Sequence, residues 1–184
     1  MTDVSNAVAT MLTGDGYACE VGAYDGEFQS NTLAFEMAGW TVLCIEANPR
    51  LEKRGREKRK LWRAVACGPQ DVESACFYSF ADGPGASALH PRADYVEMIG
   101  GVPEILQVPV RRLDRLLEEA GFPRLDYLSI DVEGYEKQVL EGFTIEQWKP
   151  KVMVIESLKD DLETPAGYER THRLVFDNVY RRLT

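Results

Sequence analysis

The residues with the clearest chemical meaning lie near the N-terminus, where a glycine-rich turn follows a short apolar run. Residues 19–26 read Cys-Glu-Val-Gly-Ala-Tyr-Asp-Gly. After a strand, Gly22 and Gly26 would let the backbone approach a ligand closely and adopt torsions that side chains forbid. A second apolar run, 41–46, ends in Glu46, and a carboxylate at a strand end can accept hydrogen bonds from a ribose diol. This pairing predicts a site for an adenosine-containing cofactor.

The spacing of the glycines and the acidic residues selects among such cofactors. The pattern Glu20-x-Gly22-x-x-x-Gly26 differs from the dinucleotide pattern G-x-G-x-x-G. The carboxylates of Glu20 and Asp25 would repel a pyrophosphate and attract the ammonium and sulfonium groups of S-adenosylmethionine. We expect Tyr24 and Asp25 at the methionine end of this cofactor, although Asp25 can also serve only to form the turn. The sequence therefore favours S-adenosylmethionine, with a nicotinamide oxidoreductase as the alternative.

A second acidic group follows two later apolar runs. If the strand stays extended through Asp131 and Glu133, both side chains point to one side, at the sheet edge where open α/β sheets bind ligands. Glu156 ends the next run. Asp131, or Glu133 as second choice, could remove a proton from an acceptor hydroxyl. Alternatively, Asp131 and Glu156 could hold Mg²⁺ or Mn²⁺, which would lower the pKa of the acceptor. A purely structural alternative is that Asp131 and Glu133 cap a helix starting near Tyr135.

Alternating strand-like and helix-like segments must position these residues. Short apolar runs, several nearly continuous, are typical of strands covered on both faces; they are 17–21, 41–46, 61–67, 125–131 and 151–157. Helical spacing of apolar residues marks 33–37, which Ser30 could cap, and 113–120. The pattern predicts one doubly wound α/β domain over residues 1–184.

The segment 68–108 interrupts this alternation. It contains several glycines and prolines and a candidate strand from Ser74 to Phe80. An insertion of this length is usually an active-site lid or a disordered loop. Its aromatic residues, Phe77, Tyr78, Phe80 and Tyr95, favour a substrate lid, with a cover for the sheet edge as the alternative.

The net charge of −9 argues against a generic nucleic-acid binder. One segment is basic; residues 50–63 contain Arg50, Lys53, Arg54, Arg56, Lys58, Arg59, Lys60 and Arg63. We interpret this segment as a solvated helix face that begins at Asn48-Pro49, rather than as a patch for an anionic substrate. No apolar stretch reaches the roughly 18 residues of a membrane span, and the first residues lack a leader pattern. The expectation is a cytoplasmic protein without a membrane partner.

Seven phrases together resemble a known family. They are Glu20-Val-Gly-Ala-Tyr-Asp-Gly26, Ser30-Asn-Thr32, Gly39-Trp40, Ile45-Glu-Ala-Asn-Pro49, Val108-Pro-Val-Arg-Arg-Leu-Asp114, Ile130-Asp-Val-Glu-Gly134 and Val154-Ile-Glu156. Their order and spacing resemble the FkbM-type S-adenosylmethionine-dependent methyltransferases, over about Tyr17 to Arg182. Two features depart from that pattern. Ala47 stands where a proline is common, and the extension before the first strand is short.

The resemblance implies a Rossmann-like class I methyltransferase fold. In this fold a mostly parallel seven-stranded sheet has helices on both faces and ends in an antiparallel hairpin, here about 168–175 and 178–183. The implied reaction is O-methylation of a small-molecule or carbohydrate acceptor, a sugar or natural-product intermediate, with Asp131 and Glu133 as catalytic residues. The implied cofactor contacts are Glu20, Gly22, Tyr24, Asp25, Gly26, Ser30, Asn31, Glu46, Ala47 and Asp131. A non-catalytic module that binds the cofactor is a further alternative, and the sequence leaves the oligomeric state open.

Overall fold

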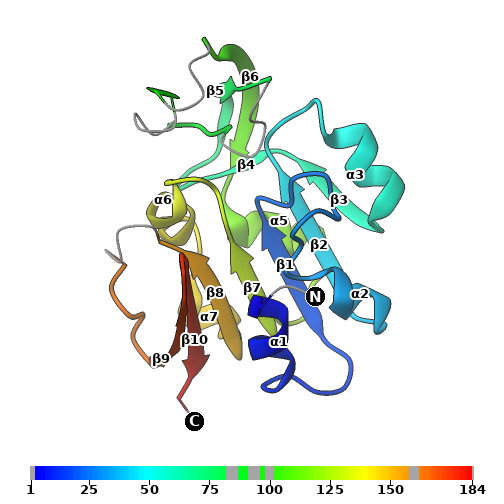
Figure 1. Cartoon of the computed structure of the whole chain (residues 1–184), viewed down its shortest axis with the longest axis vertical. Helices are drawn as coiled ribbons and strands as arrows, with labels where there is room; N and C mark the ends of the chain where they lie inside the picture. The colour runs from blue at the N-terminus through cyan, green and yellow to red at the C-terminus, as the bar shows by residue number, and fades with distance from the viewer. Residues whose placement is uncertain (1–2, 82–86, 91–95, 98–101, 158–161, 184) are drawn as a thin grey trace.

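A seven-stranded sheet forms the centre of the computed structural model, which describes residues 3–81, 87–90, 96–97, 102–157 and 162–183 (Figure 1). Its strand order is β3-β2-β1-β7-β8-β10-β9. The parallel strands are β1 (Tyr17–Val21), β2 (Thr41–Glu46), β3 (Leu61–Ala64), β7 (Tyr127–Ile130) and β8 (Val152–Glu156). The strand β10 (Asp177–Arg182) runs antiparallel to both β8 and β9 (Tyr168–Leu174). The predicted parallel sheet with an antiparallel terminal hairpin is confirmed.

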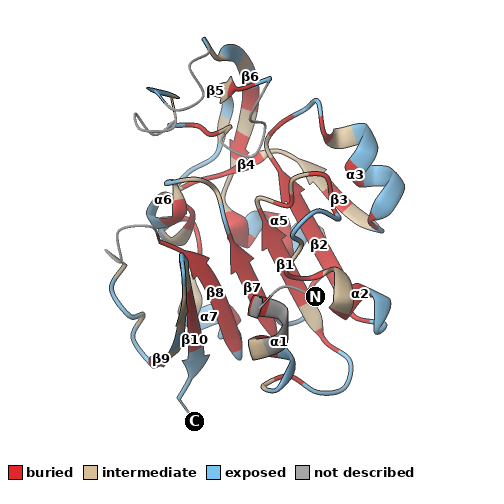
Figure 2. Cartoon of the chain, viewed as in Figure 1, coloured by how far each residue is buried: buried red, intermediate tan, exposed pale blue. Residues whose placement is uncertain are grey.

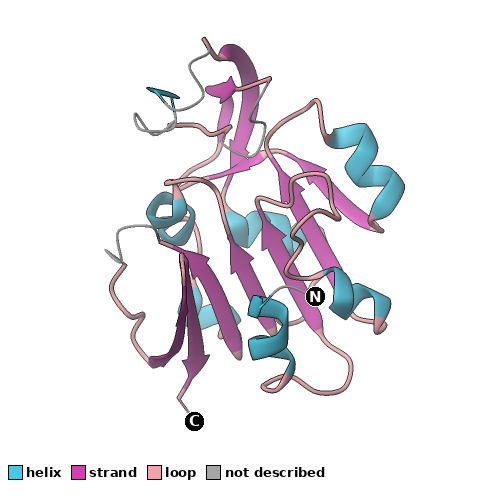
Figure 3. Ribbon diagram, in the orientation of Figure 1, coloured by secondary structure: helices cyan, strands magenta, loops and turns pink. Residues whose placement is uncertain are grey.

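Short helices cover both faces of this sheet (Figure 3). They are α1 (Asp3–Ala9), α2 (Leu33–Met37), α3 (Glu52–Lys58), α5 (Leu113–Glu119), α6 (Glu136–Glu141) and α7 (Ile145–Trp148). Alternate residues of each strand enter different core clusters, because successive side chains of a strand point to opposite faces. One cluster joins Cys19 and Leu43 to Leu116 of α5. The other joins Ala18 to Val8 of α1 and Phe35 of α2. The central strands are therefore buried on both sides (Figure 2).

A second, three-stranded sheet stands beyond the carboxyl ends of the parallel strands (Figure 1). Its order is β4-β6-β5, with β4 (Ala66–Cys67), β5 (Val72–Ser79) and β6 (Glu104–Arg111). Two expectations are corrected here. The run 61–67 is not one strand, because it breaks at Val65 into β3 and β4. The described part of 68–108 is also more than a lid loop, since it pairs β5 with β6 around its own small core. Tyr95, expected in the lid, lies outside the described residues.

Local hydrogen bonds explain where two helices begin. The N-cap residue of α2 is Thr32, without a side-chain cap hydrogen bond, so the expected Ser30 cap is wrong. Ser30 instead fixes the turn before the helix, where its hydroxyl accepts the amide of Leu33 at 3.0 Å. The helix α3 starts later than expected, because Asn48 first forms a turn in which its carbonyl accepts the amide of Leu51. Within the described ranges, no helix has the length and apolar content that crossing a bilayer would require.

Candidate functional site

A pocket of about 230 Å³ opens at the carboxyl ends of β1, β2 and β7. Eight of the predicted cofactor residues line it, namely Glu20, Gly22, Tyr24, Ser30, Asn31, Glu46, Ala47 and Asp131. The other two, Asp25 and Gly26, do not belong to its lining. The pocket therefore brings together the first strand's turn, the end of the second strand and the carboxylate that follows β7.

A glycine is needed at position 22 for a steric reason that the sequence did not reveal. Its φ is +87°, which favours glycine. A Cβ atom at this position would lie 1.7 Å from the backbone carbonyl oxygen of Asp131. The amide of Asp131 in turn donates to the carbonyl of Val21 at 2.9 Å. The glycine thus allows the turn after β1 to pack directly against the turn after β7, and this packing joins the two halves of the pocket.

The carboxylate of Glu46 is fixed at the pocket wall by backbone amides. One oxygen accepts the amide of Tyr24 at 2.8 Å, and the other accepts the amide of Asn48 at 2.7 Å. Burial raises the pKa of Glu46 to about 7, against the lowering effect of these hydrogen bonds. Donors from a bound ligand would favour the ionised form. The Glu46 carboxylate therefore has a fixed position on the pocket wall.

Cations compensate the two acidic residues of the glycine-rich turn. Glu20 pairs with the buried guanidinium of Arg59 at 3.2 Å, and Asp25 pairs with Lys58 at 2.8 Å. Asp25 also accepts the amides of Glu27 and Phe28. Burial alone would raise the pKa of Asp25, but the hydrogen bond from Lys58 and those amides lower it. Both carboxylates that we expect to attract a sulfonium are therefore paired with cations of the protein, and Asp25 also forms the turn.

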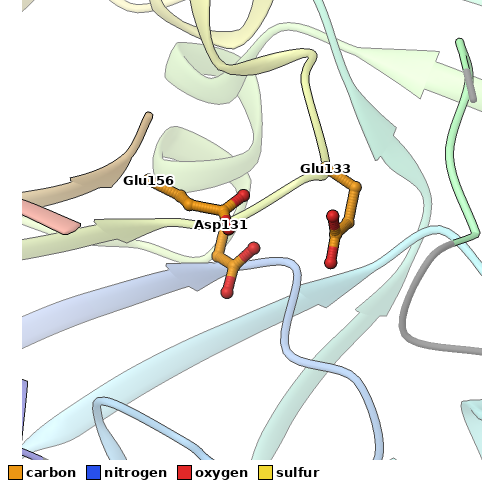
Figure 4. A group of neighbouring side chains, drawn as sticks. All are labelled: Asp131, Glu133 and Glu156. Atoms are coloured by element: carbon orange, nitrogen blue, oxygen red, sulfur yellow. The ribbon is translucent and has the colours of Figure 1, made fainter. Parts of the chain in front are cut away.

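Three carboxylates gather where β7 and β8 end (Figure 4). Carboxylate oxygens of Asp131, Glu133 and Glu156 all lie within 4.8 Å of one another. The expected route to this cluster is wrong, because the strand does not continue through Glu133. β7 ends at Ile130, and Glu133 has the left-handed φ of +59°. A tight turn, rather than strand alternation, therefore brings Glu133 to the other two.

The turn after β7 also bears on the structural alternative, in which Asp131 and Glu133 cap the following helix. Glu136, in the first turn of α6, accepts the amides of Val132 at 3.1 Å and Gly134 at 3.0 Å. These amides precede the helix, whose N-cap residue is Tyr135 and has no side-chain cap hydrogen bond. Glu136 instead fixes the turn before α6, and the carboxylate of Asp131 lies on the pocket wall.

Two carboxyl groups of this cluster, those of Asp131 and Glu156, have raised pKa values. Asp131 is accessible from the pocket, but protein atoms surround its carboxyl group, and this burial together with the charge of Asp177 raises its pKa well above the ordinary range. Burial and the charge of Asp131 likewise raise the pKa of Glu156. A hydrogen bond joins the two carboxyl groups. Both shifts favour a proton shared by the pair, which could be exchanged with a bound hydroxyl. The three oxygens could equally ligate a divalent cation.

Sequence reasoning missed several residues of the pocket wall. Ser129 lies two positions before Asp131 on the same side of β7, and its hydroxyl accepts a hydrogen bond from the Asn31 amide group at 3.2 Å. Strand alternation could have identified it. Other wall residues come from the second sheet and the loop beside it. Phe77 was among the aromatic residues expected in the lid, whereas no signal in the sequence placed Leu89 against the cofactor turn.

Comparisons with known proteins agree with this architecture. The sequence matches the family model of the methyltransferase FkbM domain over residues 20–181. The methyltransferase FkbM from Methylobacillus flagellatus KT superposes with a TM-score of 0.56 at 13% identity, covering 98% of this chain and 48% of that chain. The tRNA (uracil-54, C5)-methyltransferase of Pyrococcus abyssi, in complex with S-adenosyl-L-homocysteine, gives a TM-score of 0.44 at 12% identity, covering 99% and 37%.

The chain thus spans about half the length of the first of these structures, at 48%. No curated protein matches its sequence. The family model nevertheless extends from the first strand of the sheet into its last strand. The chain belongs to the FkbM methyltransferase family.

Proposed function

We propose that this chain transfers a methyl group from S-adenosylmethionine to a hydroxyl oxygen of a sugar or natural-product intermediate. Family membership supports the methyl transfer. The observation that carries the choice of an oxygen acceptor is the carboxylate cluster of Asp131, Glu133 and Glu156 at the pocket. A hydroxyl is a poor nucleophile until its proton is removed, and this cluster holds the groups that could remove it.

The pocket residues fit this cofactor. Glu46 would bind the ribose hydroxyls, since its two oxygens are already oriented by backbone amides. Ile45 and Val65 give the same pocket apolar surface suited to an adenine ring. The turn at Gly22 and the side chain of Asn31 would lie along the methionine portion. The bound cofactor supplies an electrophilic methyl group on its sulfonium.

Two routes could activate the acceptor. In the first, Asp131 accepts the proton of the acceptor hydroxyl, and the hydrogen bond from Glu156 positions the Asp131 carboxylate. In the second, Asp131, Glu133 and Glu156 hold Mg²⁺ or Mn²⁺, which binds the hydroxyl and lowers its pKa. We propose the first route, because the hydrogen bond between Glu156 and Asp131 orients the Asp131 carboxylate without a cation.

The second sheet would complete the acceptor site. Phe77, Ser87, Ala88 and Leu89 form a wall of the pocket, and we propose that this wall contacts the acceptor in the manner of a lid. The buried thiols of Cys19, Cys44 and Cys67 are free, as a reducing compartment permits. This supports the proposal that the protein acts in the cytoplasm.

The experiment measures cofactor binding first and methyl transfer to an acceptor second. Calorimetry with S-adenosylmethionine and with NAD should show binding of the first alone. The protein is then incubated with cofactor carrying a tritiated methyl group and a panel of sugars and hydroxylated natural products. We expect label in an ether that resists alkali. Transfer to nitrogen or carbon alone would contradict the oxygen acceptor, and cofactor binding without transfer to any of the panel would favour a non-catalytic module.

A further inference from the structure

Arg59 directly follows α3, and its side chain is completely buried, with 0% exposed. Its guanidinium pairs with Glu36 through Nε and donates from Nη2 to the Thr32 hydroxyl at 2.8 Å. Its Nη1 atom contacts three further groups, namely Glu20 Oε2 at 3.2 Å, the Gly26 carbonyl at 3.0 Å and the Ser30 hydroxyl at 3.1 Å. Arg59 therefore does not belong to the solvated face expected for the basic segment.

The groups that Arg59 contacts enclose the cofactor turn. Glu20 and Ser30 line the pocket, whereas Gly26 and Thr32 support it from outside. Gly26 has a φ of +83°, and a Cβ there would lie 2.8 Å from the Cγ of Arg59. The turn thus passes directly over the arginine stem. One side chain fixes both ends of the turn, since it contacts the end of β1 and the start of α2.

We propose that Arg59 is a positioning residue for the cofactor, which holds residues 20–32 in their binding shape and neutralises Glu20. This inference rests on the proposed binding of S-adenosylmethionine in the pocket. It goes further by assigning the affinity to the geometry of the turn, rather than to attraction between the Glu20 charge and the sulfonium.

The chemistry of the guanidinium explains why an arginine is present. A planar group with five N–H donors can serve several acceptors at fixed angles, whereas a lysine ammonium has three donors at one point. Two buried carboxylates, Glu20 and Glu36, share this one cation. Burial without a cation would be strongly unfavourable for them. Arg59→Lys keeps the charge and loses most of the geometry, so it separates the two contributions.

The test measures affinities of folded variants by calorimetry for S-adenosylmethionine and for S-adenosylhomocysteine, which lacks the sulfonium charge. In Arg59→Lys we expect both affinities to fall together by about tenfold or more, because a loosened turn must be ordered on binding. The double variant Arg59→Met/Glu36→Gln keeps the net charge of the cluster, but leaves Glu20 without its cation. Here we expect weaker binding of both ligands, with a higher preference for the charged one than in the wild type.

The control is Arg56→Met, on the same helix, which removes only the exposed pair with Glu52. Its affinities should equal those of the wild type. If the Arg59 variants do not fold, Thr32→Val tests the same network from the other side, because the Thr32 hydroxyl joins Arg59 to Glu20 at 2.8 and 2.6 Å and lies outside the pocket lining. We then expect affinity to fall severalfold. Wild-type affinities in folded Arg59 or Thr32 variants would show a merely structural role and overturn the inference. Failure of the wild type to bind either ligand would instead overturn the proposed function, and this inference with it.

Discussion

Replacement of Glu46 by glutamine tests the cofactor site most simply. The substitution preserves the shape of the side chain and removes the charge. It also leaves one of the two backbone amides, of Tyr24 or Asn48, facing an amide donor instead of an oxygen. Hydrogen bonds to a charged group contribute about 1.5–3 kcal/mol. We therefore expect the affinity for S-adenosylmethionine at about pH 8 to fall by about 10- to 150-fold.

The raised pKa of Glu46 adds a second observable. Its pKa is about 7 in the empty pocket, whereas the ribose hydroxyls would stabilise the ionised form. Protonation then competes with binding, so wild-type affinity should fall about tenfold between about pH 8 and pH 6. The effect on folding of the empty protein has the opposite sign. Because folding raises this pKa, the stabilising contribution is present at acid pH and is lost as the pH rises through about 7.

Calorimetry across this pH range, with wild type and Glu46→Gln side by side, separates Glu46 from the other titrating groups. The variant retains Asp131 and Glu156, so any pH dependence that remains in it belongs to groups other than Glu46. We expect most of the dependence to disappear in the variant. Wild-type affinity in Glu46→Gln, or an equal pH dependence in both proteins, would refute the placement of the ribose at Glu46.

Three further perturbations test other parts of the account. Gly22→Ala should destabilise the protein to urea by more than about 2 kcal/mol, because its Cβ would collide with the Asp131 carbonyl; unchanged stability would contradict that packing. Asp131→Asn should lower turnover by about 10²–10⁴-fold with little change in cofactor affinity, and activity that survives a chelator in the wild type would exclude the metal route. Asp114 accepts the Thr144 amide at 2.8 Å and the Trp148 indole at 3.0 Å. Asp114→Asn should therefore cost about 1.5–3 kcal/mol in urea unfolding at neutral pH. Burial would raise the pKa of Asp114, but the hydrogen bonds from Thr144 and Arg112 lower it. The difference in stability should therefore shrink as the pH falls through the native pKa, and a difference independent of pH would contradict the assignment.

The central sheet could be predicted because its strands are buried on both faces. Continuous apolar runs such as 41–46 and 151–157 carry that signal directly, and they became β2 and β8. The strand β6 carried no such signal, since its residues alternate in burial and Pro109 interrupts it. Sequence alone could not show that β5 pairs with it across residues 80–103. The candidate strand from Ser74 to Phe80 therefore overlapped β5, but its partner β6 and the second sheet were not predicted.

Site residues could be predicted where they stand at the ends of strands. They could not be predicted where they depend on contacts between side chains that are distant in the sequence. Glu46 and Asp131 directly follow or end apolar runs, and both line the pocket. Arg59 stands in a basic segment whose other members are mostly exposed, so its residue type indicated a solvated face. Its burial depends on Glu20 and Glu36, which lie 39 and 23 residues away. Neither the local spacing of residues nor their secondary-structure propensity predicts such long-range contacts.

The central claim is that the pocket binds S-adenosylmethionine with its methyl group at the carboxylate cluster. A crystal structure from crystals soaked with this cofactor tests it most directly. The account predicts the ribose hydroxyls within hydrogen-bond distance of Glu46, the methionine portion along Gly22 and Asn31, and the sulfonium methyl facing Asp131. Cofactor bound with its ribose away from Glu46, or with its methyl turned away from the carboxylate cluster, would contradict the account.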